Sequence, residues 1–122
     1  MRDPKNLQVF HMADRLALLV YHETRCFPKE ELFGLVSQMR RCAVSIPSNI
    51  VEGCSRDSLT EYLRFVYIAY GSSKELQYQT SLAARLGYME KADVLQGACN
   101  EMSMALSGLI KGIQQEAAKN AK

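Results

Sequence analysis

The sequence has no tryptophan, and it has few of the residues that form turns, with seven glycines and three prolines among 122 residues. That scarcity argues against a β-sandwich, a collagen-like chain or any other loop-rich fold. No apolar run approaches the ~18 residues of a membrane-spanning helix, and we expect no membrane contact. The first ten residues mix charged and polar side chains, unlike a secretory signal, and we therefore expect a cytoplasmic protein.

An excess of charge of one sign is also lacking. Fifteen lysines and arginines stand against thirteen aspartates and glutamates, which gives a net charge of +2. Nucleic-acid-binding domains usually show a larger basic excess or a clear basic cluster. The candidate basic patch here consists of Arg40 and Arg41, with Arg56 and Arg64 further along the chain. From the sequence, these arginines either face solvent or another subunit, or they contact phosphate.

Motifs for catalysis and metal binding are missing as well. The sequence has no phosphate-binding loop, no nucleophile elbow and no Glu-x-x-His pair of the kind that di-iron bundles use. His22 and Cys26 lie four residues apart and could touch one zinc ion, but two ligands do not make a site. We therefore predict a protein that is not an enzyme and has no catalytic residue, metal or cofactor.

Paired cysteine motifs do not occur among Cys26, Cys42, Cys54 and Cys99. A chain long enough to build its own core needs no disulfide, and we expect all four to be reduced thiols. Cys99 lies on an apolar stripe and is predicted to be a small core residue. Cys42 lies one position before such a stripe, and its environment stays open.

The sequence is rich in long stretches in which apolar residues recur at alternating steps of three and four. Four such stripes cover residues 10–27, 32–50, 59–83 and 92–113. This spacing is typical of bundle helices, and short connections make neighbouring helices antiparallel. We predict an all-α, antiparallel up-down-up-down four-helix bundle. It forms a single domain over residues 1–116, followed by a frayed C-terminal tail at 117–122.

Turn and capping residues mark the predicted helix ends. Pro28 can open the second helix, and Gly53 can close it as a left-handed cap. Ser58 and Glu61 have the spacing of a capping box at the start of the third helix. Gly87 can close that helix.

Two residues interrupt the helical pattern. Pro47 removes one backbone hydrogen bond inside the second helix, which therefore bends or splits there. Gly71 stands in the middle of the third helix, where glycine costs ~1 kcal/mol relative to alanine. A glycine at such a position suggests the close approach of another helix. We expect the Pro47 bend and the Gly71 gap to be neighbours in space.

The densest polar cluster surrounds Pro47. It is either a recognition surface or a hydrogen-bonded network that repairs the break in the helix and fixes its register. Together with polar and small residues of the third helix it forms what we term the polar motif: Ser45, Pro47, Ser48, Asn49, Glu52, Gly53, Gly71, Ser72 and Glu75.

The third helix has more apolar surface than one core can cover. Beyond its main stripe it carries two further apolar lines, one of Leu63, Tyr67 and Tyr70 and one of Phe65, Ile68, Leu82 and Leu86. A helix that is apolar nearly all round is usually buried on more than one side, which predicts self-association or a protein partner. The alternative is a single wide stripe whose tyrosines are partly exposed.

Residues 40–56 read Arg-Arg-x-Ala-Val-Ser-Ile-Pro-Ser-Asn-Ile-x-Glu-Gly-x-x-Arg, which resembles the signature of a bacterial family, the ribosomal RNA intervening-sequence proteins. The run from Phe27 to Glu31, the pair Gly71-Ser72 and the triplet Leu86-Gly87-Tyr88 also match, so that the resemblance covers about residues 7–113. It implies a four-helix bundle that assembles into homopentamers and has no known catalytic residue.

A related branch comprises the accessory variability proteins of diversity-generating retroelements, which form basic pentameric barrels and bind nucleic acid and a reverse transcriptase. The resemblance therefore implies RNA or DNA, and a reverse transcriptase, as partners. It places nucleic-acid contacts at Arg40, Arg41, Arg56, Arg64 and Lys74. This chain differs in having a charge of only +2.

Two functional hypotheses follow. The first is a non-enzymatic homo-oligomeric adaptor, pentameric by resemblance, that binds RNA or DNA through a basic surface summed over the ring. The alternative is an oligomeric protein-interaction scaffold with no nucleic-acid role.

Overall fold

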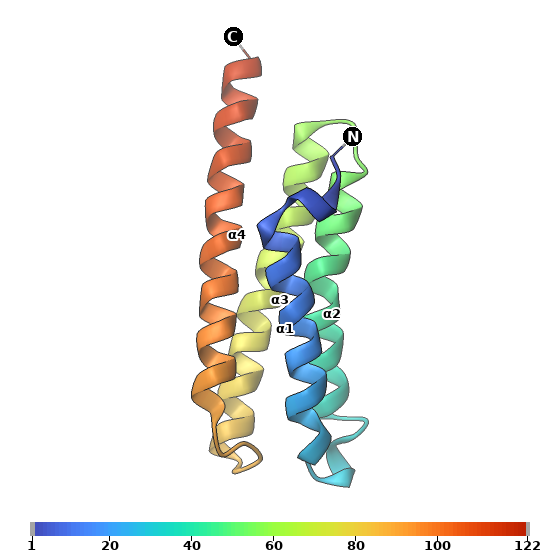
Figure 1. The fold of residues 1–122 in the computed structure, drawn as a ribbon, viewed down its shortest axis with the longest axis vertical. Coiled ribbons are helices and arrows are strands. Elements are labelled where there is room, and N and C mark those ends of the chain that lie inside the picture. The colour runs from blue at the N-terminus through green and yellow to red at the C-terminus, as the bar shows by residue number, and fades with distance from the viewer. Residues whose placement is uncertain (1, 122) are drawn as a thin grey trace.

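The computed structural model describes residues 2–121 and confirms the all-α four-helix bundle (Figure 1). The helices are α1 (Gln8–Glu23), α2 (Leu35–Cys54), α3 (Leu59–Arg85) and α4 (Ala92–Asn120). Three short 3-10 helices lie at Pro4–Asn6, Thr24–Cys26 and Lys29–Glu31. Each α-helix packs on the one before it, and α4 closes the bundle against α1. The α2–α3 side is therefore opposite the α1–α4 side.

The helices differ in length, and this leaves part of α4 uncovered. α1 has 16 residues and α4 has 29, and the C-terminal turns of α4 extend beyond α1 (Figure 1). α4 stays helical through Asn120, and Lys122 lies outside the described residues, so fraying of the tail 117–122 stays a prediction. None of the described helices combines the length and the apolar character needed to cross a bilayer.

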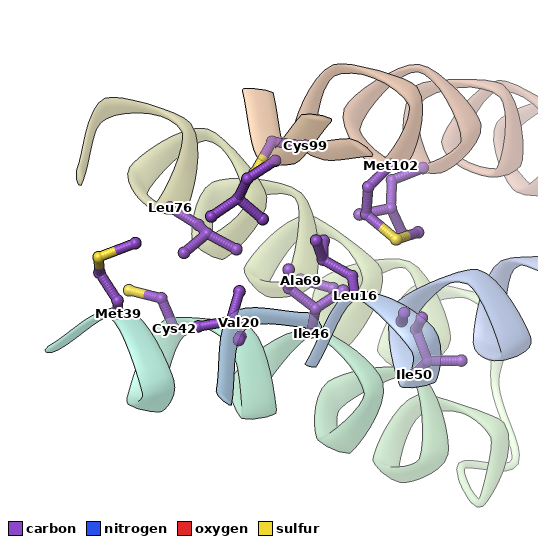
Figure 2. Close-up of a cluster of buried hydrophobic side chains, with 14 of the residues drawn as sticks. Leu16, Val20, Met39, Cys42, Ile46, Ile50, Ala69, Leu76, Cys99 and Met102 are labelled. Carbon is purple, nitrogen blue, oxygen red and sulfur yellow. The ribbon is translucent and has the colours of Figure 1, made fainter. Parts of the chain in front are cut away.

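The core lies along the bundle axis and draws on all four helices, as the close-up in Figure 2 shows. The four predicted stripes supply most of it, because a repeat of three and four residues keeps one face of each helix turned inward. Leu76 and Cys99 are 0% exposed, which confirms the core position predicted for Cys99. Cys42, whose place the sequence left open, is buried at the α2–α3 contact with 8% of its surface exposed.

The start of α3 follows its predicted signal. The Ser58 hydroxyl oxygen accepts the Glu61 backbone N–H at 3.1 Å, which confirms the N-cap. The Glu61 carboxylate turns instead to Arg64, at 3.2 Å. At the other end, Gly87 follows the last residues of α3 as predicted, and its φ of 82° is in the left-handed region.

The predicted start of the second helix is wrong, and so is the left-handed cap predicted at its end, although the helix ends within one residue of Gly53. Pro28 precedes the 3-10 helix Lys29–Glu31, and α2 begins only at Leu35, whose backbone N–H is accepted by Glu31 Oε1 at 3.1 Å. Gly53 is not a left-handed cap, since α2 continues through it to Cys54. Its lack of a side chain serves packing, because a Cβ there would lie 3.0 Å from Tyr62 Cδ1 and 3.1 Å from Phe65 Cβ.

Pro47 does not split the second helix, because α2 runs unbroken through it. Gly71 does not mark a close approach, and that prediction is wrong: the residue is exposed, and a Cβ added there would meet nothing within 4 Å. The two regions nevertheless lie side by side, as predicted, since Ser45 Oγ and Ser72 Oγ are 2.9 Å apart. The register turns Ser72 toward α2 and Gly71 outward.

Candidate functional site

The polar motif lies on the α2–α3 side, where three of its members form a network. The Asn49 amide donates to the Ser45 carbonyl oxygen at 2.8 Å and to Ser45 Oγ at 3.0 Å. Ser45 in turn pairs with Ser72 across the helices. The Ser45–Ser72 bond links α2 to α3 and so supports the helix register that the structural interpretation of the motif predicts. The three bonds do not repair the break at Pro47, because the carbonyl oxygen that Pro47 leaves without its helical partner belongs to Ala43. Ser48 is exposed and points away from this network.

Arg56 and Arg64 converge on one aromatic ring at the turn between α2 and α3. Their guanidinium carbons lie 4.9 and 4.8 Å from the centroid of Phe65. Each also pairs with a carboxylate of its own helix region, Arg56 with Glu52 and Arg64 with Glu61. The two predicted basic residues are therefore brought together, but their charges are largely compensated.

Arg40 and Arg41 line a shallow hollow of about 390 Å³, which we term the arginine hollow; its five lining residues are Tyr21, Ser37, Arg40, Arg41 and Val44. None of them is a carboxylate. The Arg40 guanidinium stacks 4.6 Å from the Tyr21 ring centroid, and its Nε donates to Thr24 Oγ1 at 3.0 Å. Arg40 is thus held in place, whereas Arg41 is exposed. A fixed and a free guanidinium side by side suit an anionic oxygen ligand such as phosphate.

Lys74 lies on α3 at about the level of Arg41, but two residues, or ~200° round the helix, from Ser72, so it is on the side of α3 that faces away from α2. The Ser45–Ser72 bond sets residue 41 level with residue 76, so Lys74 is displaced from Arg41 by only ~3 Å along the bundle. Glu75 lies beside Cys42 in the same region. The pair Arg56 and Arg64 is ~20 Å away along α2, so the five predicted basic residues do not form one patch: Arg40 lies with Arg41, Arg56 with Arg64, and Lys74 apart on the outer face of α3.

Sequence reasoning missed Tyr21 and Ser37 as members of the arginine hollow. Ser37 lies one helical turn before Arg40 and Arg41, a spacing that the sequence does show. Tyr21 comes from α1, and only the packing of α1 against α2 brings it to Arg40.

No pattern in the sequence indicates that Phe33, in the loop before α2, is 93% exposed.

Burial shifts the ionisation of two core thiols. Burial raises the pKa of Cys99 to about 11, although a hydrogen bond with Thr80 works against the shift. Burial, followed by the nearby Glu75 carboxylate, raises the pKa of Cys42 to about 11 as well. Both thiols therefore stay protonated, and are poor nucleophiles, at neutral pH.

These shifts predict a loss of stability at alkaline pH. In the unfolded chain a thiol ionises near its ordinary pKa of 9.0, whereas the pKa of the folded Cys99 is about 11. Between pH 9 and pH 11 the unfolded state therefore binds fewer protons than the folded state, and the free energy of unfolding falls as the pH rises. Urea unfolding at pH 8, 9 and 10 should give a less steep decline for Cys99→Ala than for the natural chain. The exposed Cys26 provides the control, and an equal change in slope for Cys26→Ala would contradict this account.

The fold and the site define the protein's class, a small helical bundle with a polar helix–helix network and surface arginines. No group of three or more His, Cys, Asp or Glu side chains is placed to hold a metal ion within residues 2–121. The family model of the 23S rRNA-intervening sequence protein matches residues 5–108, and the chain belongs to this family. The resemblance carried by residues 40–56 is thereby confirmed.

A solved structure agrees with the fold. It is the crystal structure of a protein with unknown function from the S23 ribosomal protein family of Bacteroides thetaiotaomicron VPI-5482. The two share 22% sequence identity with a TM-score of 0.77, over 84% of this chain and 95% of that chain. At this identity the likeness shows the fold alone. No curated protein matches the chain.

Proposed function

We propose that this protein is a non-enzymatic, homo-oligomeric adaptor that binds nucleic acid. The observation that carries the proposal is the arginine hollow, where two guanidinium groups meet and no lining residue is a carboxylate. Guanidinium groups bind phosphate oxygens through charge-assisted hydrogen bonds, and such contacts supply most of the affinity for a nucleic-acid backbone.

The α1–α4 side supports self-association. Its helices make the sparsest contacts of the four sides, and a slot of about 130 Å³ opens between them. Arg15 and Glu101, of opposite charge, line this slot. Leu18 and Met104, outside the slot on the outer faces of α1 and α4, are 67% and 66% exposed. Apolar surface flanked by both signs of charge suits a second copy of the chain.

The arginine hollow opens on α1 and α2, away from the α4 surface used in this contact. We propose five copies, the number that the family resemblance implies. Five chains of +2 carry +10 in total, and the ring repeats each hollow five times. This repetition compensates for the weak charge of one chain, because multivalent binding gains affinity without new contacts.

The test is binding of a labelled RNA hairpin, followed by fluorescence anisotropy at ~50 and ~200 mM salt, a range over which several phosphate contacts lose orders of magnitude in affinity. Arg41→Glu should weaken binding at least about tenfold, since it removes one phosphate contact and adds a repulsion. Lys119→Glu makes the same charge change at the end of α4 and should have little effect.

Light scattering on each variant separates loss of binding from loss of assembly. Salt-independent binding that Arg41→Glu leaves unchanged would overturn the adaptor. A monomeric mass for the natural protein would overturn the proposed homo-oligomer.

The second candidate is an oligomeric protein-interaction scaffold. The observation that favours it is the loop before α2, where Phe33 is 93% and Leu32 51% exposed. Aromatic side chains that stand free in this way commonly anchor protein interfaces. A reverse transcriptase is the partner that the family resemblance implies for either function. An assembly that ignores RNA at both salt concentrations, yet loses a protein partner on Phe33→Ala, would support the scaffold.

A further inference from the structure

The outward face of α3 carries a second stripe with the same alternating steps of three and four as the core face. From Arg64 to Arg85 this α3 stripe consists mainly of cationic, aromatic and small residues: Arg64, Tyr67, Gly71, Lys74, Tyr78 and Arg85. Tyr67 and Tyr78 are 47% and 60% exposed, and the charged members are exposed too. The core does not explain this pattern, because the stripe faces away from it.

The two tyrosine rings are held at the surface by neighbouring polar groups. The Gln114 side-chain amide, from α4, donates to the Tyr67 hydroxyl oxygen at 2.9 Å. The Arg85 guanidinium lies 6.0 Å from the centroid of the Tyr78 ring. Rings positioned in this way are available for stacking and lose little conformational freedom when a ligand binds.

Gly71 lies between the two tyrosines, and its surroundings are open. A Cβ built there would meet nothing within 4 Å, so no contact of this chain requires glycine. Glycine inside a helix costs ~1 kcal/mol relative to alanine. The residue leaves a low stretch of bare backbone between the rings, over which a bulky ligand can pass closely.

We propose that the α3 stripe binds single-stranded nucleic acid, with unpaired bases stacked on Tyr67 and Tyr78 and phosphates beside Lys74 and Arg85. The inference rests on the proposed function and adds the strand type and the residues that read it. Stacking on aromatic side chains requires bases that are free of a duplex, and a cationic groove with stacking rings is the common way to hold a single strand.

The dimensions of the stripe agree with this ligand. Tyr67 and Tyr78 are eleven residues apart, or ~16 Å along the helix, and Arg64 to Arg85 spans ~32 Å. A fully stacked strand rises ~3.4 Å per nucleotide, so the stripe covers at most about nine nucleotides, and fewer where the bases are splayed apart. Site sizes of about 4–16 nucleotides are usual for single-strand binding modules.

The charges favour an anionic polymer over a second copy of the same helix. The stripe carries three cations and no carboxylate, and two identical stripes packed together would set like charges against each other. The nearest carboxylates lie beside the stripe: Glu61 pairs with Arg64, and Glu75 follows Lys74 on the α2 side. Lys74 and Arg85 are therefore the stronger phosphate contacts.

The test compares a labelled 12-nucleotide oligouridine with the RNA hairpin. Tyr78→Ala should weaken oligouridine binding about five- to 150-fold, the fold-change that corresponds to the ~1–3 kcal/mol measured per stacked base. Tyr78→Phe keeps the ring and should bind like the natural chain. The chain has no tryptophan, so Tyr78→Trp provides a single reporter whose fluorescence should fall when a base stacks on it.

The outcomes distinguish this inference from the proposed function. If Tyr78→Ala binds oligouridine normally while Arg41→Glu weakens hairpin binding, the α3 stripe does not bind single strands and the proposed adaptor function stands. Loss of binding by Tyr78→Phe, or a changed oligomer mass for Tyr78→Ala, would overturn the stacking role. Natural protein that binds neither RNA would overturn both proposals.

Discussion

Leu76→Ala is expected to lower the free energy of unfolding by about 2–5 kcal/mol, the range found for leucine truncations in close-packed cores. Leu76 is 0% exposed in the middle of α3 and belongs to the cluster drawn in Figure 2. The substitution removes apolar contacts, and it leaves a cavity that the surrounding rigid helices cannot fully close. Urea unfolding followed by circular dichroism measures the change.

Leu18→Ala is the matched control, since it makes the same change on a side chain that is 67% exposed. Its effect on a single chain should stay within about 0.5 kcal/mol. Both variants need measurement at two protein concentrations, because assembly adds stability by mass action. A loss of stability for Leu18→Ala that grows with protein concentration would mark Leu18 as a subunit contact. Equal losses at every concentration would contradict the assignment of Leu76 to the core.

The period of the apolar residues made the core predictable. Val66, Ala69 and Leu76 follow steps of three and four, and such steps keep one helix face on the bundle axis whatever the neighbouring helices are. The pairing of Arg56 and Arg64 with carboxylates was also visible in principle. Glu52 lies four residues before Arg56, and such spacings bring side chains together on one helix face.

Other features could not be predicted from the sequence, because they depend on contacts between distant parts of the chain. The start of α2 depends on Glu31, whose carboxylate accepts the Leu35 backbone N–H. The same carboxylate accepts a hydrogen bond from the Tyr88 hydroxyl at 2.9 Å, and Tyr88 is 57 residues away in the sequence. The capping residues near Pro28 do not indicate that contact. The arginine hollow likewise depends on Tyr21, which reaches Arg40 only because α1 packs on α2.

The close approach predicted at Gly71 occurs instead at Gly53, for a reason that the spacing contained. Gly53 continues the inward steps through Ile46 and Ile50, which places it against α3. Gly71 falls instead on the outward steps with Tyr67 and Lys74. A glycine has no side chain whose polarity shows which face it occupies, so it must be assigned from the register of its neighbours.

Gly53→Ala should be less stable than Gly71→Ala by about 1–3 kcal/mol, the usual penalty for overpacking. Both sites are helical and gain ~1 kcal/mol in helix propensity from alanine, so their difference isolates the contact with α3. At Gly53 the new Cβ would lie 3.1 Å from Phe65 Cβ and 3.3 Å from the Tyr62 carbonyl oxygen. Neither atom can move away without displacing the α3 backbone, whereas Gly71 has open space.

Thermal and urea unfolding of the two alanine variants measure this difference. Gly71→Ala should unfold at a higher temperature than the natural chain, because it gains helix propensity without any clash. If Gly53→Ala is stabilised equally, the α2–α3 contact yields by the few tenths of an ångström that the added Cβ requires. If Gly71→Ala folds stably yet loses oligouridine binding, the bare backbone between Tyr67 and Tyr78 is needed by the ligand. Ligand binding would then explain a glycine that no contact within the chain requires.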